Sequence, residues 1–178
     1  MLRCNGLFCV LISCLMLGCD FQRIDPPQPP APQPIGRRER LMRPLVSLRW
    51  AESFWTEGLI WADVDGTSER VYLYPDSVLE AKHMERVVGM PAEGGIPAIF
   101  MSFNAAGQER IEHATADAKG RRLALVVDGS VVCAAVLSGP LRKDAVMTGA
   151  FDLAEAKRLG QRINDCRLEE SAGRPIAP

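Results

Sequence analysis

The sequence predicts a single α+β domain in which a mainly antiparallel sheet carries about three helices packed on one face. Three observations predict this class: short β-rich runs recur along the chain, turn signals separate them, and three stretches combine a helix cap with apolar residues at helical spacing. With 178 residues the chain has room for one modest core. Its formal net charge of −1 gives no indication of nucleic-acid binding.

The N-terminal segment has the layout of a secretory signal. An apolar run over 7–17 follows a basic residue and is too short to span a bilayer comfortably. The run ends in Gly18-Cys19 and resembles a bacterial lipoprotein signal, in which a small residue precedes the cysteine that becomes the acylated N-terminus. We therefore expect a signal peptide over 1–18 and lipid attachment, as palmitate, at Cys19; an uncleaved or conventionally cleaved signal is the alternative. Asp20 resembles an inner-membrane retention mark, which favours the periplasmic side of the bacterial inner membrane.

Residues 19–44 are expected to form a lipid-anchored linker. The stretch over 26–34 is mostly proline and favours polyproline II, which at about 3.1 Å per residue would hold a domain roughly 28 Å from the membrane. The folded domain is expected over 45–166. Residues 167–178 are expected to be a disordered tail.

The strands follow from period-two alternation and from β-rich runs bounded by turn residues. Strands are predicted at 46–50, 59–64, 71–74, 98–103 and, more weakly, 145–148. Asp65-Gly66 turns the chain between the second and third of these strands.

A hairpin is predicted over 121–139, where two apolar arms flank Asp128-Gly129. This dipeptide favours a type I′ turn, because both central residues of that turn need positive φ. Both arms are apolar on both faces, which is typical of central strands. We interpret the hairpin as buried scaffold; a functional acid at Asp128 is the alternative.

Three helices follow from their caps. The first is expected to start at Ser77, with Glu80 completing a capping box; the second starts at Asn104 and ends before Gly120; the third starts at Asp152. Their inward faces are predicted to be Ala81, Met84 and Val88 in the first, Ile111, Ala114 and Ala118 in the second, and Ala156, Leu159 and Ile163 in the third.

Two cysteines, Cys133 and Cys166, lie in the predicted folded domain. An exported compartment permits a disulfide between them. A buried thiol at Cys133 is the alternative, because this residue stands within a predicted strand and a buried cysteine behaves as a small hydrophobe.

Candidate chemistry is sparse. Glu109, His113 and Asp117 share a helical face at i, i+4 and i+8, which could hold a metal ion in a small hydrolase. A solvated face with local charge pairs is the simpler interpretation. The sequence contains no zinc-type cysteine spacing, no nucleophile elbow and no phosphate-binding loop. We therefore expect no enzymatic activity, no cofactor and no metal.

Two adjacent aromatic residues, Phe54 and Trp55, stand in a predicted loop between two glutamates. Packing into the core is the simpler expectation. If the pair is exposed, it is a candidate contact for a partner.

Three blocks of the sequence resemble the head of the first periplasmic domain in SecD and SecDF protein-translocase subunits. These are MSFNAAGQERIEHAT, GRRLALVVDGSVVCAAVL and TGAFDLAEAKRLGQRI. The sequence departs from the family pattern at Ala135, where a proline is common, and at Asp152, where threonine is usual. It also lacks the transmembrane bundle and the intramembrane acidic residue of the full-length relatives. The resemblance implies a head domain alone, without motor activity.

Together these features predict a non-enzymatic, membrane-tethered periplasmic domain that contacts exported or unfolded polypeptide. The expected surface is either an open sheet edge or an apolar groove near Trp50, Trp55 and Trp61. The alternative is a structural accessory subunit of a translocase or envelope complex.

Overall fold

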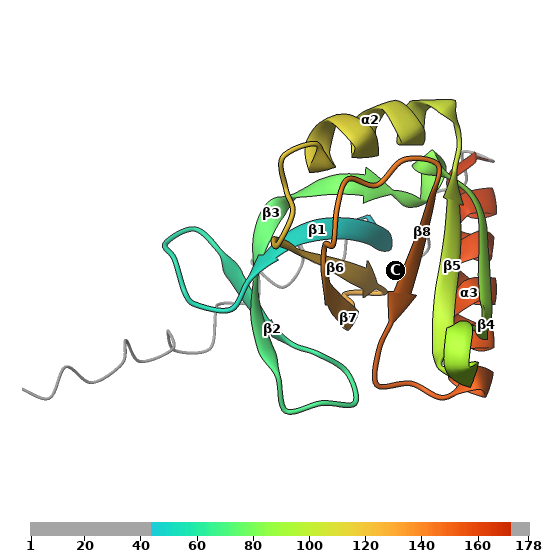
Figure 1. Ribbon diagram of the computed structural model, residues 1–178, viewed down its shortest axis with the longest axis horizontal. Coiled ribbons are helices and arrows are strands. Elements are labelled where there is room, and N and C mark those ends of the chain that lie inside the picture. The colour runs from blue at the N-terminus through green and yellow to red at the C-terminus, as the bar shows by residue number, and fades with distance from the viewer. Residues whose placement is uncertain (1–43, 172–178) are drawn as a thin grey trace, which may run out of the picture.

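Within residues 44–171, which the computed structural model describes, eight strands form two antiparallel sheets (Figure 1). The larger sheet has the strand order β2-β3-β1-β6-β7, and the smaller has the order β4-β5-β8. The larger sheet consists of β1 (Val46–Glu52), β2 (Ile60–Asp63), β3 (Arg70–Glu80), β6 (Arg122–Val127) and β7 (Ser130–Val136). The smaller sheet consists of β4 (Met84–Pro91), β5 (Pro97–Phe103) and β8 (Asp144–Thr148).

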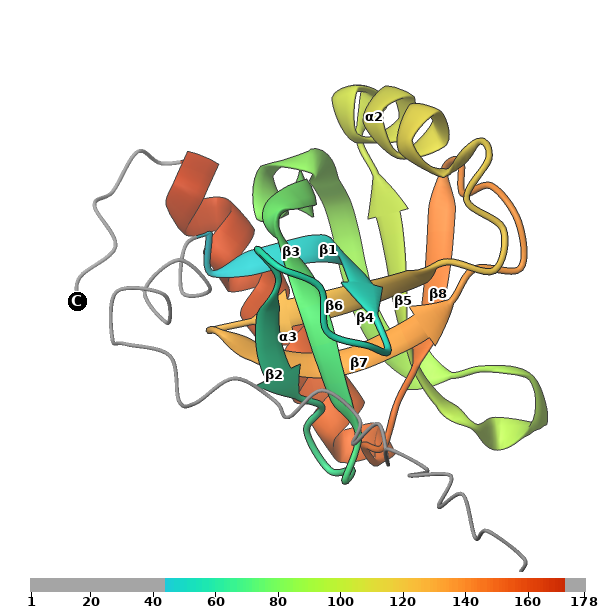
Figure 2. The same ribbon diagram turned by 90° about the vertical axis from the view of Figure 1, so that its left-hand side faces the viewer.

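This part of the chain contains two α-helices, α2 (Ala105–Thr115) and α3 (Leu153–Ser171), and two short 3-10 turns, η1 (Ala81–His83) and η2 (Glu93–Gly95). Helix α3 lies behind β4 and β5 in Figure 1, whereas α2 packs on β3 and η1 and stands apart at the top of Figure 2. The α+β class is therefore correct, but the prediction of about three helices on one face is wrong.

The segment after Ser77 accounts for the missing helix. Here β3 continues to Glu80, one 3-10 turn reverses the chain, and β4 begins. The expected cap residues do interact: Ser77 Oγ donates to Glu80 Oε1 at 3.0 Å, and the Glu80 backbone N–H donates to His83 Nδ1 at 3.1 Å. They close a single turn only. The β-branched pair Val87 and Val88 then aligns with Met101 and Phe100 of β5, and this sheet pairing overrides the local helix signal.

The other two helices begin where the sequence predicts. The Asn104 side chain accepts a hydrogen bond from Gly107 N–H at 2.9 Å, and Asp152 Oδ1 accepts one from Glu155 N–H at 2.7 Å. Helix α2 ends at Thr115, earlier than expected, and α3 continues to Ser171, past the predicted domain end at residue 166.

The hairpin over 121–139 is confirmed. Strands β6 and β7 pair around Asp128 and Gly129, whose φ angles of 49° and 81° fit the predicted turn. Strand β6 is central, but β7 lies at an edge of the sheet, so only one arm occupies the predicted central place. The Asp128 carboxylate accepts two hydrogen bonds of 2.9 Å from Arg162 on α3, which ties the turn to that helix.

The larger sheet curls until its two edge strands meet. Val64, just after β2, forms a parallel bridge with Val131 of β7, and Asp65 N–H donates to the Val131 carbonyl at 2.9 Å. A small apolar cluster fills this partly closed barrel, with Val71, Leu73 and Val126 among its members.

The main core joins both sheets and both helices into one domain. Leu48 and Leu125 of the larger sheet share one buried cluster with Met101 of β5, Ile111 of α2 and Ile163 of α3. No helix within residues 44–171 is long and apolar enough to cross a bilayer. The predicted signal peptide, the lipid attachment at Cys19 and the linker up to residue 43 lie outside the described residues and stay predictions.

A candidate binding groove between two sheet edges

Strands β7 and β8, each at the edge of its own sheet, border an apolar groove. Their Cα atoms come within 8 Å of each other. The groove has a cavity volume of about 90 Å³. It is lined by Leu48, Leu123, Ala135, Val136, Leu137, Ser138, Leu141, Ala145, Val146 and Met147. None of these side chains carries a charge.

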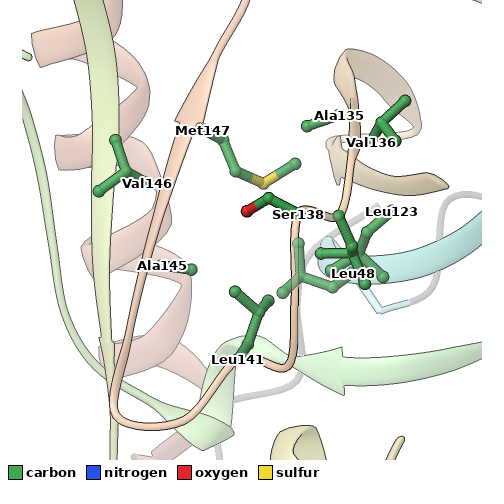
Figure 3. Close-up of a pocket in the computed structure, with 10 residues that line it drawn as sticks. Leu48, Leu123, Ala135, Val136, Ser138, Leu141, Ala145, Val146 and Met147 are labelled. Carbon is green, nitrogen blue, oxygen red and sulfur yellow. The ribbon is translucent and has the colours of Figure 1, made fainter. Parts of the chain in front are cut away.

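The groove has a buried aliphatic floor and an exposed rim. Leu48, Leu123 and Met147 are at most 4% exposed, whereas Val136 and Val146 on the rim are 61% and 50% exposed. Figure 3 shows Met147 reaching from β8 toward β7, while the Val146 side chain points away from the cavity. The exposed rim valines leave the mouth of the groove apolar as well.

Backbone polar groups face the groove from both strands. Phe103 N–H donates to the Lys143 carbonyl at 2.9 Å, so residues 143, 145 and 147 direct their backbone groups toward β5. Leu137 N–H likewise donates to the Arg121 carbonyl at 2.8 Å on the β6 side. Because antiparallel strands alternate, the N–H and C=O of Val146 and of Val136 point to the opposite side, away from their own sheets. Both strands thus offer hydrogen-bonding groups to an added strand.

The loop between β7 and β8 closes the groove and is held by helix α2. Thr115 is fully buried; its hydroxyl donates to the Ile111 carbonyl at 2.7 Å and accepts from Leu141 N–H at 2.9 Å. This pair of bonds fixes Leu141 against the cavity. Sequence reasoning missed Thr115, because its role depends on a loop 26 positions further along the chain.

Cys133 and Cys166 are both free cysteines, so the disulfide that the sequence permits is not formed in this structure. Both side chains lie in the main core. Burial raises the pKa of the Cys133 thiol to about 12, so this thiol is protonated at neutral pH and is a poor nucleophile. The alternative interpretation of Cys133 as a small buried hydrophobe fits the structure.

The candidate metal ligands Glu109, His113 and Asp117 do not form a site. All three are exposed on or just after α2. Residues 44–171 contain no group of three or more histidine, cysteine, aspartate or glutamate side chains that could hold a metal ion. The solvated-face interpretation fits the exposure of these three side chains.

Phe54 and Trp55 lie in the loop between β1 and β2 and are 66% and 38% exposed. The expectation that they pack into the core is wrong. The three tryptophans do not form one surface: Trp50 is half-buried beneath the Arg121 guanidinium, 4.2 Å from the ring centroid, and Trp61 is covered by Arg70 at 4.5 Å.

A second hollow of about 370 Å³ lies between α2 and the larger sheet. Trp50 is the only tryptophan that lines it. The other lining residues are Tyr74, Asp76, Ser77, Val78, Arg110, His113 and Ala114. This mixed lining differs from the apolar groove that the sequence predicted near the tryptophans.

Comparison with known proteins identifies the family. The model of the SecDF P1 head subdomain matches residues 58–168, which is more than half of the chain. The chain belongs to the SecDF P1 head subdomain family. The resemblance noted in the sequence is therefore confirmed. The matched region begins at residue 58, within the loop between β1 and β2 and after Phe54 and Trp55.

One curated relative is the protein translocase subunit SecD of Acidaminococcus fermentans, which is 28% identical over 108 residues, covering 58% of this chain and 26% of that protein. The chain thus spans about a quarter of the length of this relative. A crystal structure of SecDF in a super-membrane-facing form matches 72% of this chain and 20% of its own, with a TM-score of 0.55 and 19% identity. A second structure, of SecDF as a membrane component that enhances protein export, matches 67% of this chain and 61% of its own, with a TM-score of 0.53 and 17% identity. At these identities the two structures show a shared fold.

Proposed function

We propose that this SecDF P1 head subdomain is a non-enzymatic binding domain that holds an extended segment of exported or unfolded polypeptide at the groove between β7 and β8. The observation that carries the proposal is the combination of an uncharged apolar groove with strand edges whose backbone groups point outward. Strand addition to a sheet edge is a recurring mode of peptide recognition, in which the backbone supplies affinity. The SecD relative is named as a translocase subunit, which agrees with a substrate of this class.

The polypeptide adds to one edge instead of entering between the two strands. A strand inserted between β7 and β8 would need them about 9.6 Å apart, twice the usual spacing of about 4.8 Å. Their Cα atoms come within 8 Å, so insertion would require the sheets to separate. We therefore place the extended segment along β8, with hydrogen bonds to the backbone of Val146.

One apolar side chain of the bound segment enters the cavity. The cavity of about 90 Å³ is smaller than the roughly 150 Å³ that accommodates benzene. The groove therefore favours aliphatic side chains over aromatic ones. Because its lining is uncharged, a charged side chain at this position would lose its hydration without gaining a partner. Such a site accepts many different apolar sequences and disfavours charged side chains. These properties fit the binding of unfolded apolar segments.

A lipid at Cys19 and the linker up to residue 44 would tether the domain to the periplasmic face of the membrane. With this tether, the groove would meet polypeptide emerging from the membrane at a raised local concentration. We propose a contribution to protein export on this basis. Proton-driven motor activity is not part of the proposal.

The test is calorimetric titration of the purified full chain with a permanently unfolded peptide that has alternating valine residues. Val136→Asp should weaken binding at least 10-fold, because the new carboxylate stands at the mouth of the groove. Leu168→Asp is the matched control: Leu168 is 58% exposed on α3, lines no part of the groove, and should bind like wild type. Absence of peptide binding to the wild-type chain, or equal binding by both variants, would remove the proposal.

The exposed pair Phe54 and Trp55 favours a second role as an accessory subunit of a membrane complex. Exposed aromatic side chains are typical anchors at protein interfaces, and Phe54 and Trp55 lie outside the residues that the family model matches. Affinity capture from the native membrane should recover a membrane complex with the wild-type chain and lose it with the double variant Phe54→Ser, Trp55→Ser. Recovery of the same components with both forms would rule out this role for the loop.

A further inference from the structure

The smaller sheet has one covered face and one bare face. On the covered face, Ile99, Met101 and Met147 are at most 4% exposed. Helix α3 lies directly on this face, because a Cβ atom added to Gly89 would be only 2.1 Å from the Ala156 backbone. In Figure 1 the helix is behind β4 and β5. The other α-helix of the described residues, α2, packs mainly on β3 and η1, so neither helix lies over the opposite face of the sheet.

The bare face is apolar at its centre. Residues paired across antiparallel strands share a face, so the register places Val88, Phe100 and Val146 in one row across β4, β5 and β8. Met90, Ala98 and Thr148 form the next row. Val146 is 50% exposed and Met90 is 43% exposed, whereas Val88 and Phe100 are half-buried and the small Ala98 on the central strand is fully buried.

Opposite charges mark the two sides of this face. Arg86 on β4, Ser102 on β5 and Asp144 on β8 form the row next to the apolar centre. Arg86 and Asp144 are both exposed. Two strand spacings of about 4.8 Å separate them. Neither forms an ion pair within residues 44–171. Each is therefore available to a charge on another molecule.

We propose that this face pairs with the same face of a second copy of the chain, about a two-fold axis that runs along β5. Such an axis exchanges β4 with β8 and keeps every row at its own level. Arg86 of one copy then faces Asp144 of the other, and the reciprocal pair forms on the other side of the axis. Phe100 meets its own counterpart at the centre, and Val88 meets Val146 of the second copy.

This charge arrangement selects the second copy over other occupants of the face. A two-fold axis across the strands would place Arg86 against the far end of β4, with no acidic residue from the paired rows opposite it. An unfolded polypeptide could cover the apolar rows, but it would offer no fixed acid and base at the two sides. Pairing of two copies gives each charge an opposite partner and covers the apolar centre, because an isologous interface brings the same patch of both copies together.

The interface is small, so the association is weak and depends on concentration. Three strands about 4.8 Å apart and three rows about 6.8 Å apart give roughly 300 Å² per copy. A standard interface has about 800 Å² per partner. We therefore expect a monomer–dimer equilibrium that shifts toward monomer as salt screens the two ion pairs. This inference is independent of the proposed peptide binding, because β8 keeps its outer edge free in the pair.

The experiment is sedimentation equilibrium of the full chain carrying Cys19→Ser, which cannot be acylated there, over a wide range of protein concentration. Arg86→Asp and Asp144→Arg should each weaken dimerisation at least 5-fold, and the double exchange should restore it. Phe100→Asp should abolish the dimer. Arg158→Asp, an exposed charge reversal on α3, is the matched control and should leave the equilibrium unchanged.

The outcomes separate cleanly. A chain that stays monomeric at all concentrations overturns the inference, as does a dimer that the single exchanges weaken but the double exchange does not restore. A photo-crosslinking residue in place of Val88, which lines no part of the groove, identifies the occupant of the face directly. Crosslinks to added unfolded peptide, or to residues 1–43 of the same chain, in place of a second copy would also overturn it.

Discussion

Replacing Gly89 with alanine should separate α3 from β4. The added Cβ atom would lie 2.1 Å from the backbone carbon and oxygen of Ala156, and 2.3 Å from the backbone nitrogen of Lys157. These are helix backbone atoms, which cannot rotate away as a flexible side chain could. Gly89 itself does not need the left-handed conformation, so the backbone of β4 accepts alanine and the clash alone decides the outcome.

The size of the effect follows from the distance that α3 has to move. Ordinary van der Waals contact starts at 3.4 Å, so α3 has to retreat by about 1.3 Å. A gap of 0.5–1 Å already removes about a quarter to a half of the dispersion attraction between two atoms. Overpacking of this kind typically costs about 1–3 kcal/mol, whereas replacing a strand glycine returns only about 0.5–1 kcal/mol. We expect a net loss of about 1–2 kcal/mol in the free energy of unfolding, in the upper part of the difference between these ranges, because Ala156, Ile163 and Cys166 are all fully buried along α3.

Urea denaturation followed by tryptophan fluorescence measures this loss. Gly139→Ala is the matched control, because a Cβ atom there meets nothing within 4 Å, and it should stay within about 0.5 kcal/mol of wild type. Gly160→Ala tests the same contact between α3 and β4 from the helix side. Its Cβ would lie 2.8 Å from Gly89 N, which is a milder clash, and alanine gains about 1 kcal/mol in helix propensity over glycine. Its loss should be smaller than that of Gly89→Ala. A Gly89→Ala chain as stable as the Gly139→Ala control would refute the close approach of α3 to β4.

Three further predictions concern the groove wall, the core thiol and pH. Thr115→Val leaves the Leu141 N–H without its partner and should cost about 1–3 kcal/mol in unfolding free energy, whereas Thr115→Ser should retain most of the stability; equal urea curves for the two variants would contradict this role. Alkylation of Cys133, followed by peptide mass spectrometry at pH 8, should be negligible in the native protein and complete in urea; rapid native labelling would contradict its burial. Burial lowers the pKa of His83, so its neutral form contributes stability that is present above about pH 6.5 and is lost as the pH falls through the lowered folded-state value. The melting temperature should therefore differ less between pH 7.5 and pH 5 in His83→Gln than in wild type. An equal difference in the two proteins would contradict this assignment.

Local sequence motifs predict the structure correctly where the contacts that they form are themselves local. Asp128-Gly129 closes the hairpin, and Asn104 and Asp152 cap their helices as predicted. The helix predicted after Ser77 does not form. The contact between Ser77 and Glu80 closes one 3-10 turn, and it does not determine how the following residues pair. Apolar spacing after that turn fits a helix and a strand equally well, and the pairing of β4 with β5 decides between them.

The groove could be predicted only in outline. An open sheet edge was expected, but its floor combines Leu48 of β1 and Leu123 of β6 with Met147 of β8, which lie far apart in the sequence. The wall depends on Thr115, which is bonded to Leu141 across 26 positions. No periodicity encodes such contacts, because they arise only when the two sheets meet. The exposure of Phe54 and Trp55 could not be predicted either, because an aromatic pair in a loop has the same local sequence pattern whether it is buried or exposed.

The state of the sheet edges favours β8 as the point where another strand adds. Edge strands carry unpaired backbone groups, and folded proteins usually cover them. The two edges of the larger sheet meet each other where Val64 bridges Val131. The edge of β4 is covered by α3, because the Asn164 side chain accepts from Val87 N–H at 3.1 Å and donates to the Val87 carbonyl at 2.7 Å. On β8, by contrast, the outward backbone groups of Val146 find no partner within residues 44–171. The β4 edge is thus covered by α3, and the edges of the larger sheet meet at the Val131 end of β7. The β8 edge borders an apolar groove, which is the arrangement expected if that edge is kept open for another chain.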